Sequence, residues 1–70
     1  MRTLYYKVEV THVRPTGFSK MLYTVVQSNT YDADADKERA KRNAIGYAIE
    51  DGMLINGDMV ETEILEIAET

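Results

Sequence analysis

Residues 32–52 read DADADKERAKRNAIGYAIEDG and are the only stretch of the chain that is long and periodic enough to form a helix. Apolar side chains recur there at i, i+4, i+5, i+8 and i+9, which draws one stripe on a 3.6-residue repeat. The stripe consists of Ala40, Ala44, Ile45, Ala48 and Ile49. The spacing therefore predicts an amphipathic helix on which the other segments pack.

The ends of this helix are predicted from capping residues. Asp36 is the expected N-cap, with Ala35 before it as part of a small hydrophobic staple, and Asp34 is the rival N-cap. Gly52 supplies the left-handed residue that commonly closes a helix. These signals predict a helix over residues 36–51.

Two strands are predicted before the helix. Residues 3–13 alternate between apolar and polar with a period of two, which indicates a half-buried strand. Residues 14–17, RPTG, combine proline and glycine as a hairpin loop does. We expect Phe18, beside this loop, to tuck under the hairpin. The inward face of the first strand is expected to carry Leu4, Tyr6, Val8, Val10 and His12.

The second strand, residues 21–29, is apolar on both faces, so periodicity alone does not choose its inward set. Two-sided apolar character predicts either that this strand is central in the sheet or that its second face is also covered. In a chain with one helix, that second cover comes from another molecule. The pattern therefore favours self-association, which also suits a chain of only 70 residues.

After the helix, residues 53–58 contain Asn-Gly and read either as a loop or as a short hairpin. Residues 58–67 form the third strand, and its apolar positions change face between Ile64 and Leu65, which predicts either a bulge there or an apolar patch on both faces. This strand pairs either parallel to the second or antiparallel to the first. Residues 1–70 are thus expected to form a single α+β domain of order ββαβ, a three-stranded sheet with one helix packed on one face.

Composition indicates the cellular compartment in which we expect the protein. The chain has no cysteine, which favours a reducing compartment, and we expect a cytoplasmic location. It has no long apolar run and no basic-then-apolar leader pattern, so we expect no membrane association.

The net charge of −4 conceals a gradient along the chain. Residues 1–31 carry a charge of +3, residues 32–42 are balanced, and residues 43–70 carry −7 without any base. The acids of this last part predict a partner-binding surface that docks on a basic patch of another protein, above all a nucleic-acid groove. The residues assigned to it are Glu50, Asp51, Asp58, Glu61, Glu63 and Glu66.

The alternative is a small nucleic-acid-binding module. Its phosphate contacts would come from the helix, and Tyr5, Tyr6 and Tyr23 would supply stacking platforms on the sheet. The surplus of acid opposes a polyanion, so we rank this reading second. The basic residues assigned to it are Lys37, Arg39, Lys41 and Arg42.

Signals for enzymatic chemistry are weak. The acids at 32, 34 and 36 resemble the start of a calcium loop, but Lys37 stands where that loop needs glycine and Asn43 where it needs glutamate. His12 is the only histidine, and its strand-end position predicts packing or hydrogen bonding rather than catalysis. We expect a non-enzymatic protein with no cofactor and no metal.

Three features of the layout belong together: a two-strand hairpin ending in Gln27-Ser28-Asn29-Thr30-Tyr31, a helix opening over residues 33–42, and a short acidic last strand. This layout resembles that of compact ββαβ proteins that bacteriophages and mobile elements encode to bind and inhibit host or anti-phage defence proteins. The resemblance implies a protein-binding inhibitor and, if the chain is encoded by a bacteriophage, a location in the cytoplasm of the host. It assigns no individual residue a role.

Overall fold

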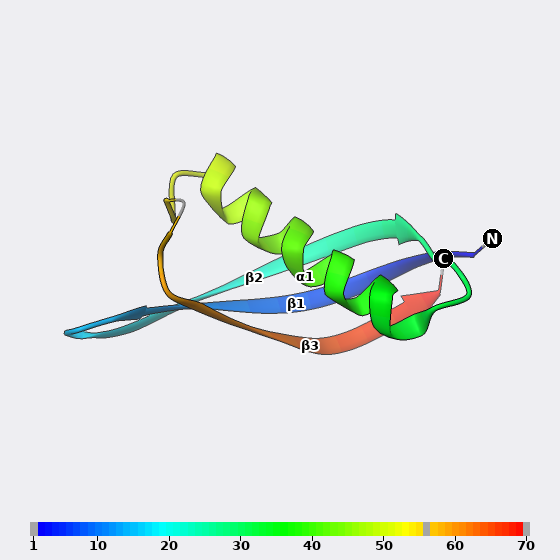
Figure 1. Cartoon of the computed structure of the whole chain (residues 1–70), viewed down its shortest axis with the longest axis horizontal. Helices are drawn as coiled ribbons and strands as arrows, with labels where there is room; N and C mark the ends of the chain where they lie inside the picture. The colour runs from blue at the N-terminus through cyan, green and yellow to red at the C-terminus, as the bar shows by residue number, and fades with distance from the viewer. Residues whose placement is uncertain (1, 56, 70) are drawn as a thin grey trace.

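The computed structural model describes residues 2–55 and 57–69 and has the predicted ββαβ order (Figure 1). Strands β1 (Thr3–Arg14) and β2 (Gly17–Ser28) form a hairpin, helix α1 (Ala33–Glu50) follows, and β3 (Val60–Glu69) ends the described chain. The helix crosses one face of a single three-stranded sheet. The predicted α+β architecture is confirmed.

The strand order is β2-β1-β3, and both pairings are antiparallel. Of the two pairings that the sequence left open, β3 therefore adopts the one antiparallel to the first strand. Of the two explanations offered for the apolar faces of the second strand, the central position is contradicted, because β3 pairs on the other side of β1 and leaves β2 at an edge. The two apolar faces of β2 have different surroundings: Val25 is fully buried toward α1, whereas Leu22 and Val26 are exposed on the opposite face.

The hairpin turns through Pro15 and Thr16, between the paired residues Arg14 and Gly17. Gly17 has a φ of 136°, a value that L-residues with a side chain rarely adopt. The prediction that Phe18 tucks under the hairpin was wrong, since its side chain is 70% exposed. Its position in β2 turns its side chain away from α1, and the hairpin end extends past the helix (Figure 1).

The core lies between α1 and the inner face of the sheet. The apolar stripe of α1 is confirmed, since its three alanines are fully buried and its two isoleucines are partly buried against the core. Alanine lets the helix backbone approach the sheet closely, and the larger side chains come from the strands. The buried residues are Tyr6, Val8, Val10, Val25, Ala40, Ala44, Ala48 and Leu54.

The start of α1 differs from the prediction. Asp32, in an extended conformation, is the N-cap, and its carboxylate accepts a hydrogen bond from the Ala35 N–H at 3.1 Å. Asp36 is not the cap. It lies inside the first turn and is only 1% exposed, because its carboxylate binds Thr30 in the segment before the helix. Both predicted caps were thus placed too far along the chain.

The end of α1 follows the prediction. Gly52 has a φ of 76°, and its N–H donates to the Ile49 carbonyl at 3.0 Å. The Met53 N–H donates to the Ala48 carbonyl at 2.9 Å. This pair of bonds is a Schellman motif, which satisfies the last carbonyls of the helix.

The segment after α1 is a loop, and no strand occurs among its described residues; Asn56 of the predicted Asn-Gly turn lies outside them. Asp58 was predicted to start the third strand but belongs to this loop. Its carboxylate accepts a hydrogen bond from the Ile55 N–H at 2.9 Å, and its own N–H donates to the Ile55 carbonyl at 3.1 Å. These bonds stabilise a turn, and β3 therefore begins only at Val60.

The predicted bulge is confirmed. Val8 pairs with Ile64 and Lys7 with Glu66, so Leu65 is the extra residue on β3. Because Leu65 has no partner on β1, a strict count of every second residue goes out of phase after Ile64. Ile67 therefore lies opposite Tyr6 on the helix side of the sheet. Simple alternation had placed Ile67 on the other face.

No helix among the described residues is long and apolar enough to cross a membrane.

Candidate functional site: the open face of the sheet

The face of the sheet opposite α1 is here called the open face. Its members follow from the strand register, because successive side chains of a strand point to opposite faces. No described segment of the chain packs on it (Figure 1). Its side chains are Tyr5, Lys7, Glu9, Thr11 and Val13 of β1, Phe18, Lys20, Leu22, Thr24 and Val26 of β2, and Glu61, Glu63, Glu66 and Ala68 of β3.

Two ion pairs cross the open face. Lys7 Nζ lies 3.3 Å from a Glu66 carboxylate oxygen, and Lys20 Nζ lies 3.7 Å from a Glu9 carboxylate oxygen. Glu61 and Glu63 form no ion pair with any residue in the described part of the chain. The negative charge of β3 is therefore left without compensation at these two positions.

Glu9 and Glu63 are direct cross-strand partners on the same face. Like charges placed opposite each other in a sheet destabilise it, by an amount comparable to the roughly 0.2–1 kcal/mol that a favourable pair contributes. Lys20 offsets part of this repulsion through Glu9, but Glu63 has no such neighbour. The strand pairing thus retains a local electrostatic conflict at the surface.

This conflict lies in an open depression of the face, near the end of the hairpin. Exposed apolar side chains lie beside it, since Phe18 is 70% exposed and Leu22 is 57% exposed. The depression therefore places exposed apolar side chains beside an acidic cluster. It is lined by Glu9, Thr11, Val13, Phe18, Lys20, Glu61, Thr62 and Glu63.

The structure divides the predicted acidic surface into two groups. Glu61, Glu63 and Glu66 share the open face, whereas Glu50 and Asp51 lie at the C-terminal end of α1, away from it. Asp51 accepts a hydrogen bond from the Tyr23 hydroxyl at 3.3 Å. The burial of the Tyr23 phenol and the nearby Asp51 charge together raise the pKa of Tyr23.

Asp58 is also separate from the open face. Its carboxylate oxygen lies 3.4 Å from His12 Nε2, while His12 Nδ1 accepts a hydrogen bond from Arg14 at 3.3 Å. This arrangement confirms the prediction that His12 takes part in hydrogen bonding at the strand end. Asp58 thus joins the loop before β3 to the end of β1.

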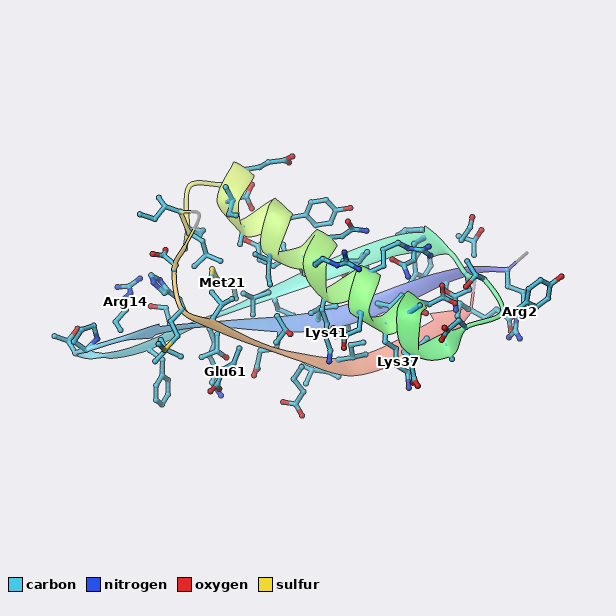
Figure 2. All side chains as sticks on the ribbon, viewed as in Figure 1. Arg2, Arg14, Met21, Lys37, Lys41 and Glu61 are labelled. Carbon is cyan, nitrogen blue, oxygen red and sulfur yellow. The ribbon has the colours of Figure 1, made fainter. Side chains whose placement is uncertain are left out.

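The four basic residues of the alternative reading do not share one surface. Lys37 and Lys41 reach from α1 toward β3 and line a groove there (Figure 2). Arg39 points to the other side, where it donates to the Ser28 carbonyl at 2.5 Å. Arg42 is exposed and has no partner among the described residues.

The tyrosines do not form a stacking platform either. Tyr6 is buried, and its hydroxyl donates to Asn29 Oδ1 at 2.8 Å. Tyr23 lies on the helix side against Tyr47, with ring centroids 6.3 Å apart. Only Tyr5 of the three is exposed on the open face, at 43%.

The acidic opening of α1 does not gather ligands for a metal. The Asp32 carboxylate accepts a hydrogen bond from the Ala35 N–H, and the buried Asp36 carboxylate accepts one from the Thr30 N–H, so the two carboxylates bind different backbone groups. Over residues 2–55 and 57–69, no group of three histidine, cysteine, aspartate or glutamate side chains is placed to hold a metal ion.

Sequence reasoning missed Glu9 and Phe18 as members of the site. Glu9 entered the sequence analysis only through the charge of +3 over residues 1–31, in which it is the one acid, but the alternation of β1 already places it on the face opposite Val8 and Val10. The missing information was the order of the strands. Only the pairing of β1 with β3 brings Glu9 beside Glu63.

No protein family, curated protein or solved structure matches this chain.

Proposed function

We propose that this chain is a non-enzymatic protein-binding domain that docks its open face on a basic surface of another protein. The observation that carries this proposal is the acidic cluster of Glu9, Glu61 and Glu63, in which Lys20 compensates only Glu9. Features that weaken a fold locally are expected where a surface serves binding. A basic partner would remove the repulsion between Glu9 and Glu63 on contact.

The surroundings of this cluster favour a protein as the partner. Phe18 and Leu22 offer apolar area beside the acids, and a folded protein can bury apolar area and pair charges in one interface. A nucleic acid would meet an acidic surface on this face and would find the helix bases divided over different sides. The proposed partner therefore presents lysine or arginine around an apolar centre.

Inhibition would follow from such binding if the basic surface is where the partner itself works. A groove that holds nucleic acid is basic for that reason, and an acidic domain bound there would compete with the nucleic acid. This is the role that the resemblance to small phage and mobile-element proteins implies. It remains part of the proposal.

The test is affinity capture from a lysate of the source cells, treated with nuclease, on three immobilised proteins. These are the wild type, a Glu61→Gln/Glu63→Gln variant, and a control Glu38→Gln/Glu50→Gln variant that removes the same charge from exposed positions of α1. We expect one protein to be retained by the wild type and the control and lost from the β3 variant. Rising salt should lower its retention, because screening weakens charge complementarity.

Two results would contradict the proposal. Retention that is equal on all three proteins would show that the acids of β3 do not take part. Material that disappears after nuclease treatment would identify a nucleic acid as the bound species instead.

A further inference from the structure

No strand of the described residues pairs with the outer edge of β3, and the register defines which backbone groups face this edge. The Val13 N–H donates to the Met59 carbonyl at 3.0 Å, so this residue pair is hydrogen-bonded. Antiparallel strands alternate between hydrogen-bonded and non-hydrogen-bonded pairs. The N–H and C=O groups of Val60, Thr62 and Ile64 therefore point away from β1, toward the free edge.

A groove runs along this edge on the helix side of the sheet. One wall is formed by Lys37 and Lys41 of α1, and the floor by residues 62–67 of β3 (Figure 2). Ile67 is 42% exposed although it lies on the helix side, since α1 covers β1 and β2 more closely than β3. The groove thus offers apolar contact beside unpaired backbone groups.

On the helix side of the sheet, side chains of α1 contact β2, which forms the other edge. Arg39 donates to the Ser28 carbonyl near the end of β2, and Tyr47 lies against Tyr23 further along. Side chains of α1 therefore already contact the helix side of β2. The β3 edge is the better place for an additional strand.

We propose that an extended segment of the protein partner adds to β3 as a fourth strand, next to residues 60–64. On the open face, alternate side chains of this segment would lie beside Glu61 and Glu63, which favours lysine or arginine there. On the helix face, the intervening side chains would lie beside Thr62 and Ile64, under the stems of the two lysines, which favours apolar residues. The ligand is a strand in which basic and apolar residues alternate. This inference rests on the proposed function and specifies its binding mode.

The charge pattern argues against a second copy of β3 as the added strand. In an antiparallel pair of two β3 strands centred between Ile64 and Leu65, Glu63 of each copy would lie opposite Glu66 of the other. Like charges in direct opposition disfavour that pairing. A basic segment from a different protein removes the repulsion instead of adding to it.

The experiment uses an eight-residue peptide in which lysine and valine alternate, and a control peptide of the same composition arranged in pairs, Lys-Lys-Val-Val-Lys-Lys-Val-Val. Binding to the full chain is measured by titration, and amide hydrogen exchange is followed by NMR. We expect the alternating peptide to bind more tightly. It should also slow the exchange of the outward-pointing amides of Thr62 and Ile64.

The matched variants are Thr62→Pro on β3 and Thr24→Pro on β2. In both strands the replaced N–H points to a free edge, where proline is compatible with the fold. Thr62→Pro should weaken binding of the alternating peptide about tenfold, because it removes a donor and places a ring at the pairing edge. Thr24→Pro removes a donor at the opposite edge, outside the depression lined by Glu61 and Glu63, and should weaken binding less than Thr62→Pro does. Thermal melting checks that both variants are folded.

The results separate the two proposals. If Glu61→Gln/Glu63→Gln weakens peptide binding while Thr62→Pro does not, and the amides of Thr62 and Ile64 stay unprotected, strand addition is wrong and docking through the open face stands. If neither change weakens binding, both proposals fail. Protection of these amides that rises with protein concentration in the absence of peptide would identify a second copy as the occupant and overturn the inference. Should Thr62→Pro fail to fold, the exchange of the wild-type amides decides alone.

Discussion

Thr30 donates two hydrogen bonds to the carboxylate of Asp36, one from its N–H to Oδ2 at 2.9 Å and one from its hydroxyl to Oδ1 at 2.9 Å. Arg39 adds a contact at 3.3 Å to Oδ1. The carboxylate is only 1% exposed, and these contacts satisfy it. The link between β2 and α1 is therefore fixed by a buried charged group.

Removal of this carboxylate should destabilise the fold. Asp36→Ala is expected to lower the free energy of unfolding by about 1–3 kcal/mol, because it breaks charge-assisted bonds and leaves the Thr30 N–H without its acceptor. Chemical denaturation measures the loss. The control is Asp34→Ala, an exposed acid in the same turn, which should cost much less. Equal losses for both variants would contradict a special role for Asp36.

Ala44 tests the packing of α1 on the sheet. It is fully buried, so Ala44→Asp would place an unpaired carboxylate in a small core and should abolish folding. Circular dichroism and thermal melting detect the result. Asn43→Asp adds the same side chain at the exposed neighbouring position and should melt close to the wild type. A folded Ala44→Asp variant would show that the helix packs through another face.

Glu63 tests whether the acidic cluster weakens the fold. Glu63→Gln should raise the free energy of unfolding by about 0.5 kcal/mol, since it removes the repulsion with Glu9. The same change should weaken binding of the basic partner. Glu66→Gln, in contrast, should not stabilise the fold, because it breaks the pair with Lys7. Denaturation curves at low salt make the comparison, and a less stable Glu63→Gln variant would refute it.

The raised pKa of Tyr23 predicts that the stability of the fold decreases at high pH. Its pKa is raised by burial and by the Asp51 charge, so the folded state favours the neutral phenol. The stability gained in this way is present below the ordinary tyrosine pKa of about 10 and is lost as pH rises through the higher folded value. The difference between the absorbance titrations of the wild type and Tyr23→Phe isolates this group. In Asp51→Asn the pKa of Tyr23 should move down.

Self-association remains a prediction. The open face carries Phe18 and Leu22 without cover from the described chain, and a second copy would bury them. Analytical ultracentrifugation at high micromolar concentration should show a dimer that is lost in Phe18→Ser/Leu22→Ser. A monomeric wild type under these conditions would exclude it. The two serine changes lie outside the core, so the variant should stay folded.

The sequence predicted those parts of the fold that depend on local period and turn chemistry. The alanine stripe, the Gly52 cap and the bulge at Leu65 each have a local physical cause, and each is confirmed. The prediction of the helix start was wrong because three aspartates compete for the N-cap position. The choice depended on Thr30, which binds Asp36 and leaves Asp32 to cap the helix.

The site was less accessible to sequence reasoning because it depends on strand order. The period of two places Glu9 and Glu63 on outward positions but does not say that they are neighbours. Only the antiparallel pairing of β1 with β3 brings them together. Glu50 and Asp51 precede the acidic strand in the sequence, but they end α1, which carries them to the other side of the sheet.

The bulge at Leu65 has a consequence for colloidal behaviour. Without this residue the ladder would continue from Ile64 directly to Glu66, and every later side chain would keep its present face. The core therefore does not require Leu65. Its effect falls on the outer edge of β3, where it breaks the regular spacing of donors and acceptors and leaves only a short uninterrupted run before it. Such a run can accept one brief strand but gives poor support to the stacking of chain upon chain, so we expect the insertion to oppose fibre growth at this edge.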